Sequence, residues 1–290
     1  MSKVIWVINQ TAGTDHSGWG ERHINLARNW VKAGYKVYII SGSYNHLFIK
    51  QPQISGQTFT LEQVAENIHF CWVKIPHYNS ASVFKLWSMM VFAFKTLFLK
   101  PPQLKRPDHI IVSSMPIFPI LTGWYLKKKY KAQSLRFEIR DLWPITPKYL
   151  SGYSKWHPMV ILMRWIERFG YRKADHIVSL LPNAHRYINP ISKNPEKYHW
   201  ISNGIQTQPK VQEAVTQSII DSIPKDKFCI CYTGTLGMAN ALEYLVEASV
   251  ILKDDTRFFF LLVGDGYLKP TFIEKTKGNS NIKFIDKLPK

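Results

Sequence analysis

Short strand-forming runs alternate with helical stretches along most of the chain, and this alternation restricts the fold more than any other feature. Helices are expected near residues 20–33, 82–99, 117–131, 158–173 and 183–188. The runs around them are rich in β-branched and aromatic residues: KVIWVINQ, KVYIISGS, IHFCWVKI, HIIVSSMP, SLRFEIRD, HIVSLLP and KYHWISNG. Strands that alternate with helices predict an α/β protein in which a parallel sheet carries helices on both faces.

A polar stretch, residues 207–227, separates this region from a second alternating one. It contains Pro209 and Pro224, so it predicts a linker between a domain at 1–206 and a domain at 228–290. The second region has the pattern of one βαβαβ half of a doubly wound sheet, whereas a full domain of this kind has two halves. We therefore expect two Rossmann-like doubly wound domains, the second incomplete, in a C-terminally truncated chain.

Positive charge is concentrated in the first region. Residues 1–206 contain 27 Lys and Arg against 10 Asp and Glu, whereas residues 207–290 contain 11 against 10. A basic surface is typical of proteins that bind nucleic acid, anionic lipid or acidic small molecules, although it can also be merely solvated. We expect no nucleic-acid partner, because the sequence contains no helix-turn-helix, zinc-finger or RNP-type pattern.

Three features favour a cytoplasmic protein. The N-terminal sequence MSKVIWVINQ enters a strand directly and has no signal-peptide h-region. The longest apolar stretch, residues 83–99, is interrupted by two lysines and is too short to span a bilayer. Cys71, Cys229 and Cys231 have no metal-ligand spacing, so we expect buried, reduced thiols and no bound metal.

A glycine-containing loop, TAGTDHSGWGERHINLA, joins the first strand to the first helix. Gly18 and Gly20 would let the backbone approach a ligand, and the helix N-terminus that follows favours an anion. The spacing of Gly13, Gly18 and Gly20 differs from the dinucleotide-binding pattern. An ordinary flexible connection therefore explains the loop about as well as a ligand site does.

Two further glycine turns follow strands of the second region. One is Thr233-Gly234-Thr235-Leu236-Gly237 and the other is Gly264-Asp265-Gly266. The carboxyl ends of parallel strands share one edge of a sheet, and open α/β sheets bind ligands at that edge. The two turns indicate a nucleotide site, although tight turns without a ligand would have the same composition.

Charged and aromatic residues end the strand SLRFEI in the segment EIRDLWP, where an ordinary loop would contain Gly, Ser or Asn. Asp141 could orient Arg140 or accept a hydrogen bond from a sugar hydroxyl, and Trp143 could stack on a ring. A salt bridge at the strand end, with Trp143 in the core, is equally consistent with these residues.

A series of short motifs resembles family 4 of the retaining glycosyltransferases. The similarity is to the bacterial branch that builds O-antigen and capsule, the group around an L-fucosamine transferase. It extends in order over essentially all 290 residues, and RDLWP is its most specific part. The motifs are Gly18-Trp19-Gly20-Glu21-Arg22-His23, Ser113-Ser114-Met115-Pro116, residues 138–144, residues 171–178, Ser202-Asn203-Gly204, residues 232–237 and residues 263–266.

This resemblance implies a GT-B fold. The acceptor would bind to the first domain and a nucleotide sugar, here a UDP-sugar, mainly to the second, with no obligatory metal or cofactor. The resemblance implies that the RDLWP segment lines the cleft near the transferred sugar. We expect Arg140 and Asp141 to be catalytic and His16 and Trp143 to lie on the acceptor side of the cleft. The implied donor-binding residues are Gly18, Gly20, Thr233, Gly234, Thr235, Gly237, Gly264, Asp265 and Gly266.

The sequence departs from the family pattern at several positions. Arg140 stands where many members have a histidine, and Thr235 stands where an arginine often holds the diphosphate. No lysine occurs at residues 240–242, so diphosphate binding is expected to depend on backbone amides. The Glu-x7-Glu motif of the family would follow Lys290, which leaves the expected donor site half built.

The leading hypothesis is a peripheral enzyme at the inner face of the cytoplasmic membrane that transfers a sugar to a polyprenyl-diphosphate-linked glycan. The apolar residues 83–99 and the lysine cluster at 127–131 favour contact with an anionic membrane surface, although 83–99 could equally be core. The alternatives are a sugar-nucleotide epimerase of the same fold and an inactive truncated chain that only binds a membrane or a partner.

Overall fold

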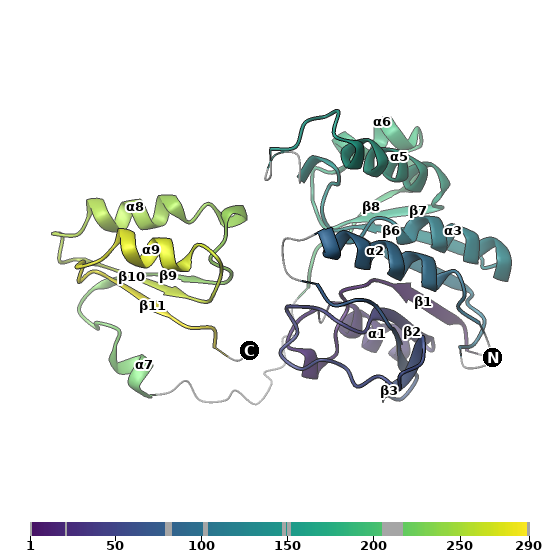
Figure 1. Cartoon of the computed structure of the whole chain (residues 1–290), viewed down its shortest axis with the longest axis horizontal. Helices are drawn as coiled ribbons and strands as arrows, with labels where there is room; N and C mark the ends of the chain where they lie inside the picture. The colour runs from purple at the N-terminus through teal and green to yellow at the C-terminus, as the bar shows by residue number, and fades with distance from the viewer. Residues whose placement is uncertain are drawn as a thin grey trace. The chain divides into compact units, whose positions relative to one another are not determined.

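The computed structural model describes residues 2–20, 22–78, 83–100, 104–146, 149, 152–204 and 217–288. The chain forms two compact units, Met1–Ile205 and Gln206–Lys290, called here the first and the second unit (Figure 1). Of the linker expected at 207–227, residues 207–216 lie outside the described residues. Helix α7 (Gln217–Asp221) lies within the same expected linker.

An eight-stranded sheet forms the centre of the first unit, in the order β3-β4-β2-β1-β5-β6-β7-β8. Its strands are β1 (Val4–Ile8), β2 (Lys36–Gly42), β3 (Phe59–Ala65), β4 (Ile68–Val73), β5 (His109–Ser113), β6 (Ser134–Ile139), β7 (His176–Ser179) and β8 (Tyr198–Trp200). Neighbouring strands are parallel except for β3 and β4, which are antiparallel. Each strand run predicted for this region forms a strand, which confirms the expected parallel sheet.

The sequence does not predict the edge strand β3. Its residues FTLEQVA alternate between apolar and polar side chains only as far as Glu62, and the strand is largely exposed. The indole Nε1 of Trp72 on β4 donates a hydrogen bond to the Glu62 carboxylate at 2.6 Å. Because an exposed edge strand lacks the continuous apolar run of the buried strands, its sequence resembles a loop.

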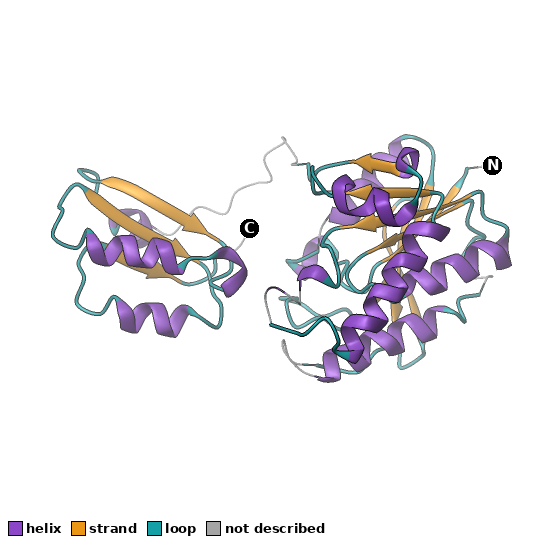
Figure 2. Cartoon of the chain, turned by 90° about the horizontal axis from the view of Figure 1, so that it is seen from above, coloured by secondary structure: helices purple, strands orange, loops and turns teal. Residues whose placement is uncertain are grey.

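Helices pack against both faces of this sheet, and Figure 2 shows them in purple beside the orange strands. They are α1 (Arg22–Lys32), α2 (Val83–Thr96), α3 (Pro119–Tyr130), α5 (Pro158–Lys173) and α6 (His185–Ser192). Successive residues of β1 separate the two cores. Trp6 and Ile8 belong to the core that includes side chains of α2, α3, α5 and α6, whereas Ile5 and Val7 belong to the core that includes α1.

Three parallel strands in the order β11-β10-β9 form the sheet of the second unit. They are β9 (Phe228–Thr233), β10 (Phe258–Val263) and β11 (Ile282–Ile285), with helices α8 (Glu243–Ile251) and α9 (Lys269–Lys275) between them. Phe260 packs with Val246 of α8 and Phe272 of α9, whereas Phe259 packs with Ile219 of α7. Helix α7 therefore covers the face opposite to α8 and α9.

The architecture is α/β with sheets of eight and three strands, which confirms the predicted fold class. The expectation of buried thiols is correct for Cys71, where burial raises the pKa to about 12. It is wrong for Cys231, which is exposed. Cys231 lies on β9, an edge strand of the smaller sheet, where one side lacks a neighbouring strand among the described residues.

Candidate functional site

A buried carboxylate, Glu138 of β6, lies at the centre of a hydrogen-bonded cluster in the first unit. Arg22, the first residue of α1, donates to Glu138 Oε1 from Nε at 3.1 Å and from Nη2 at 2.8 Å. The hydroxyl of Ser113 donates to Oε2 at 2.5 Å, and His23 Nε2 lies 3.3 Å from the same oxygen. Arg22 also donates from Nη1 to Asn203 Oδ1 at 2.7 Å. Segments far apart in the sequence therefore meet at one carboxylate.

These neighbours keep Glu138 ionised. Burial alone would raise its pKa, since the residue is only 4% exposed. Hydrogen bonds and positive charge from His23 and Arg22, together with the Ser113 hydroxyl, outweigh burial and hold the pKa of Glu138 well below its usual range. The carboxylate is therefore a fixed negative charge that holds α1 against β5 and β6.

Further hydrogen bonds fix the backbone at the end of β6. The Ser114 N–H donates to the Glu138 carbonyl at 2.8 Å, and the Arg140 N–H donates to the Ser114 hydroxyl at 2.9 Å. Asn9, which follows β1, donates from Nδ2 to the Ser113 carbonyl at 2.9 Å. The ends of β1, β5 and β6 are thus joined at the carboxyl edge of the sheet, where open α/β sheets bind ligands.

Arg140, Asp141 and Trp143 directly follow β6 at this edge. Asp141 is exposed and Arg140 is half-buried. No salt bridge between described residues involves either of them, so the strand-end ion pair, one of the two alternatives for this segment, is absent from this part of the chain. Trp143 packs against the larger core, and its indole Nε1 is buried without a hydrogen-bond partner among the described residues. The edge therefore presents a cation and a carboxylate, with an unpaired indole N–H buried beneath them.

The first glycine loop is folded tightly on itself. The Gly13 N–H donates to the Gly20 carbonyl at 3.3 Å, and a Cβ on Gly20 would lie 2.4 Å from the Thr11 carbonyl oxygen. Gly18 has a φ of 64° and ends a 3-10 helix, Asp15–Ser17. These contacts account for both glycines without a ligand. The expected role of Gly18 and Gly20 in donor binding stays a prediction.

His16 lies toward the β3 end of the sheet. It lines a cavity of about 420 Å³ together with Glu62 of β3 and Trp72 of β4. In the strand order, β2, β1 and β5 lie between β4 and β6. The structure therefore places His16 beside the far edge strands, whereas Trp143 follows β6. The cavity at His16 does not include Trp143 among its described lining residues.

The two glycine turns of the second unit pack against each other where β9 and β10 end. A Cβ on Gly264 would lie 1.8 Å from the Gly234 carbonyl oxygen, and a Cβ on Gly266 would lie 2.3 Å from that of Leu236. The two strand ends approach so closely that only glycine fits at these positions. This contact holds the predicted donor-binding residues of both turns in one compact group.

Most backbone amides of the first of these turns already have partners. The N–H groups of Gly234 and Leu236 donate to the carbonyls of Val263 and Asp265, each at 2.9 Å, and the Gly237 N–H donates to a carbonyl within its own turn at 3.0 Å. These three amides are therefore already bonded in this structure, and the expected dependence of diphosphate binding on backbone amides stays a prediction. Among the described residues of the turn, the Thr235 N–H donates no hydrogen bond.

A cavity of about 530 Å³, which Arg22 and Glu138 help to line, is bounded by side chains of α1 and of β1, β5, β6, β7 and β8. The other basic residues that line it are His23, His109, Arg136, His176 and His199. Burial, and then the Arg136 guanidinium, lower the pKa of His109 and His176, which keeps both imidazoles neutral near pH 7. Apolar side chains form most of the remaining lining.

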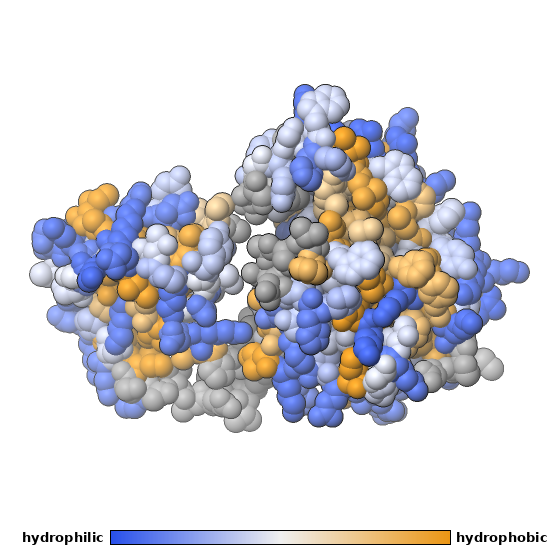
Figure 3. Space-filling model, viewed as in Figure 1, coloured by the Kyte–Doolittle hydropathy of each residue, from blue (hydrophilic) through white to orange (hydrophobic). Residues whose placement is uncertain are grey.

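Apolar side chains gather on one face of the first unit, over α2, α3 and α5, and are orange in Figure 3. Phe84, Trp87 and Phe94 of α2 and Trp165 of α5 are each more than half exposed. Trp165 lines a cavity of about 520 Å³ together with Phe98 and Lys129. The stretch 83–99 is therefore not simply core. None of the helices in the described ranges has both the length and the apolar character needed to cross a bilayer.

The Glu138 cluster lies within the motifs of the resemblance, but the sequence reasoning gave its members no role. One signal was available, because Glu138 is a carboxylate in the otherwise apolar strand SLRFEI and a buried charge needs a partner. Its partner could not be read from the sequence, since 116 positions separate Arg22 from Glu138. A search of the described residues finds no group of three or more metal-ligating side chains.

Solved structures with the same fold define the class of this protein. Sucrose-phosphate synthase from Thermosynechococcus elongatus is similar with a TM-score of 0.67 and 12% identity, over 99% of this chain and 71% of that one. Anabaena HepE in complex with UDP and glucose has a TM-score of 0.62 and 13% identity, over 99% of this chain and 70% of HepE. UDP-N-acetylglucosamine 2-epimerase from Rickettsia bellii has a TM-score of 0.54 and 13% identity, over 98% of this chain and 68% of the epimerase. The chain has the GT-B fold.

The family follows from a match over most of the first unit. Residues 17–204 match the family described as Glycosyl transferase 4-like domain. The chain therefore belongs to this glycosyltransferase family, which confirms the resemblance at the family level. A search of the curated proteins found no match.

Proposed function

We propose that this glycosyltransferase moves a sugar, with retention of configuration, from a UDP-sugar to a polyprenyl-diphosphate-linked glycan in O-antigen or capsule synthesis. Family membership over residues 17–204 is the observation that carries the proposal. In this proposal the domain at 1–206 binds the acceptor, and the domain at 228–290 binds the UDP-sugar.

The proposed reaction breaks the bond between the anomeric carbon and a diphosphate oxygen, and UDP leaves with the bonding electrons. The acceptor hydroxyl oxygen bonds to the same face of the anomeric carbon, and its proton goes to the departing UDP. Arg140 would offset the charge that develops on the diphosphate. Asp141 would accept a hydrogen bond from a sugar hydroxyl, and Trp143 would contact the acceptor. The fixed backbone at the end of β6 supports these assignments, because it holds the three residues in place.

The donor is assigned to the glycine turns that follow β9 and β10, with Gly18 and Gly20 near the transferred sugar. The unpaired Thr235 N–H supports this assignment, since a backbone amide at a strand end is a good donor to phosphate. The UDP bound by Anabaena HepE supports UDP as the nucleotide. The turn residues assigned to the donor are Thr233, Gly234, Thr235, Gly237, Gly264, Asp265 and Gly266.

The exposed apolar face of the first unit supports an acceptor at a membrane surface. Within the lysine cluster, Lys127 pairs with Asp175 at 2.7 Å, whereas Lys128, Lys129 and Lys131 are exposed. A cation near an anionic lipid surface contributes about 1 kcal/mol. We therefore place the enzyme peripherally at the inner face of the cytoplasmic membrane.

A transfer assay with a panel of UDP-sugars and lipid-linked acceptors in vesicles tests the function, with mass spectrometry of the product. Asp141→Asn and Arg140→Ala should each lower turnover about a hundredfold without changing the unfolding midpoint. Arg172→Ala, at an exposed position of α5, is the matched control and should retain wild-type turnover. A folded chain that transfers no sugar to any lipid acceptor would contradict the proposal.

A sugar-nucleotide epimerase is the second candidate, because a solved epimerase shares the fold over 98% of this chain. An epimerase needs no acceptor, so incubation with UDP-N-acetylglucosamine alone distinguishes the two activities. Epimerised product without acceptor would favour this candidate, and its absence with transfer present would exclude it. Vesicle binding without either activity would favour the third candidate, a chain that only binds.

A further inference from the structure

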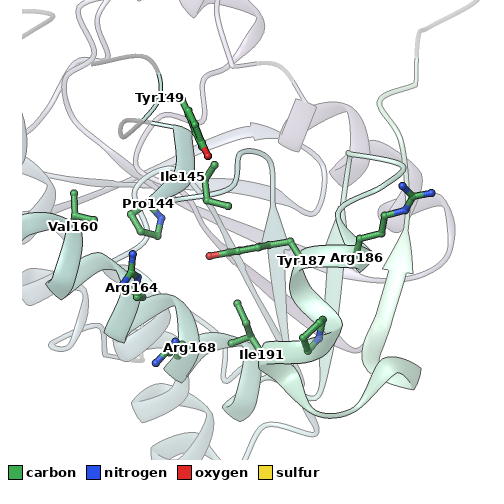
Figure 4. Close-up of a pocket in the computed structure, with 10 residues that line it drawn as sticks. Pro144, Ile145, Tyr149, Val160, Arg164, Arg168, Arg186, Tyr187 and Ile191 are labelled. Atoms are coloured by element: carbon green, nitrogen blue, oxygen red, sulfur yellow. The ribbon is translucent and has the colours of Figure 1, made fainter. Parts of the chain in front are cut away.

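A cavity of about 480 Å³ lies beside the segment that follows β6, between α5 and α6 (Figure 4). Pro144, the last residue of the EIRDLWP segment, lines one side of it, and Arg164 and Arg168 of α5 line another. In Figure 4 the Tyr187 ring points from α6 into this space, whereas the guanidinium of Arg186 points away from it. The cavity therefore adjoins the predicted catalytic segment and is lined by three arginines, two of which, Arg164 and Arg168, belong to α5.

Among the described residues, no carboxylate forms a salt bridge with Arg164 or Arg168. They are four positions apart on one helix, so their like charges lie one turn apart, which is unfavourable without a counter-charge. By contrast, Arg22 at the same edge of the sheet is paired with Glu138 at 2.8 Å.

The nearest carboxylate in the sequence, Glu167, is used elsewhere. It is fully buried, and its two oxygens accept hydrogen bonds from the hydroxyls of Tyr171 at 3.0 Å and Tyr187 at 2.8 Å. Burial raises the pKa of Glu167 to about 7, although the tyrosine hydrogen bonds and the nearby arginines oppose the rise. A large share of the molecules thus carries a neutral Glu167 at neutral pH, and the two arginines keep a net positive charge.

The spacing of the two arginines suits a ligand with two adjacent anionic groups. Each planar guanidinium can donate two parallel hydrogen bonds to one phosphate group. The same helix also presents exposed apolar side chains at Ile161, Leu162 and Trp165. One helix thus offers cations to a diphosphate and an apolar strip to a hydrocarbon chain attached to it.

We propose that Arg164 and Arg168 bind the diphosphate of a prenyl-diphosphate-linked acceptor in this cavity. The inference rests on the proposed function for the class of acceptor, and it adds the site that holds the acceptor's diphosphate. The apolar strip of α5 takes the first isoprene units. The glycan extends past Pro144 toward Arg140 and Asp141.

Isothermal titration calorimetry of the full chain with farnesyl diphosphate, without any nucleotide sugar, tests this site. The double variant Arg164→Gln with Arg168→Gln should bind about a hundredfold more weakly, since each charge-assisted interaction is worth about tenfold in affinity. Arg172→Gln, an exposed position on the same helix that does not line the cavity, should change the affinity less than about twofold. Replacing both cavity arginines by lysine, which keeps the charge, should restore part of the binding, and circular dichroism checks that each variant is folded.

Two results would overturn the inference. One is an equal affinity of wild type and a folded double variant for farnesyl diphosphate. The other is displacement of farnesyl diphosphate by phosphatidylglycerol vesicles at equal phosphate concentration, because the cavity would then be a lipid-headgroup site. The outcome is separable from that of the proposed function. Sugar transfer without farnesyl diphosphate binding would overturn only the inference, and arginine-dependent binding without transfer would support it while counting against the function.

Discussion

Replacing Glu167 by glutamine should make the first unit more stable than the wild type at pH 8 and similar to it at pH 5. Burial raises the pKa of this carboxyl from its ordinary 4.5 to about 7, and hydrogen bonds from Tyr187 and Tyr171 offset only part of the rise. The folded state therefore binds more protons than the unfolded state between these two values. The stability that the protonated carboxyl contributes is full below about pH 4.5 and is lost as the pH rises through about 7.

The size of the effect follows from the two pKa values. The rise from 4.5 to about 7 corresponds to about 3 kcal/mol, because a tenfold change in proton affinity is worth about 1.4 kcal/mol. Between pH 5 and pH 8 the wild type should lose about 2.5 kcal/mol of unfolding free energy through this group. Glutamine keeps a carbonyl acceptor and an amide donor for the two tyrosine hydroxyls and has no proton to lose, so its variant should lose almost none.

Urea unfolding followed by tryptophan fluorescence at several pH values measures this effect. All ten tryptophans lie at or before residue 200, so the signal reports on the first unit alone. Glu196→Gln, which changes an exposed carboxylate of the same unit, is the control and should keep the wild-type pH dependence. If the Glu167→Gln variant lost as much unfolding free energy as the wild type between pH 5 and pH 8, the conclusion that Glu167 is protonated in the folded protein at pH 5 would be wrong.

Three further changes have definite expected results. Glu138→Gln should destabilise the first unit by about 3 kcal/mol in the same fluorescence assay, because it leaves a buried guanidinium without its counter-charge, and a loss below about 1 kcal/mol would match only a surface ion pair. Gly264→Ala should unfold the second unit and spare the tryptophan signal of the first, since the new Cβ would lie 1.8 Å from a carbonyl oxygen of the facing turn. Hydrogen exchange at β9, β10 and β11 measures this unfolding. Protection of these strands equal to that of the wild type would contradict the prediction. Trp87→Ser with Phe94→Ser should weaken binding to anionic vesicles about a hundredfold, with Trp200→Ser, an exposed aromatic of β8, as the control. If the α2 double variant and Trp200→Ser lost equal affinity for the vesicles, α2 would have no special contact with lipid.

Buried elements of the fold could be predicted because they carry continuous apolar runs or clear helical periodicity. Helix α5, expected at 158–173, begins at Pro158 and ends at Lys173. Strand β3 could not be predicted, because an exposed edge strand needs few apolar residues and gains its order from pairing with β4. Helix α7 was predicted as part of the linker, because it has few apolar residues. Their role is visible only in the structure, where they cover one face of the second sheet.

The site could be predicted only where strand ends determine it. The placement of Arg140 and Asp141 at the carboxyl edge follows from the parallel sheet. The partners of Glu138 do not follow, because Arg22 reaches it from a distant part of the chain, and Arg22 is itself held by Asn203 from another. The hydrogen bond from the Gly234 N–H could not be predicted either, since its acceptor, the Val263 carbonyl, belongs to a neighbouring strand.

The short helix α7 sets a practical limit on dissecting this protein. Ile219 of α7 packs against Phe259 and Ile285, on the face of the second sheet that α8 and α9 do not cover. A fragment that started at the first strand of this sheet would present those side chains to water and should aggregate when expressed alone. A fragment meant for nucleotide-binding studies should therefore start before Gln217, so that α7 covers one face of the sheet and α8 and α9 cover the other.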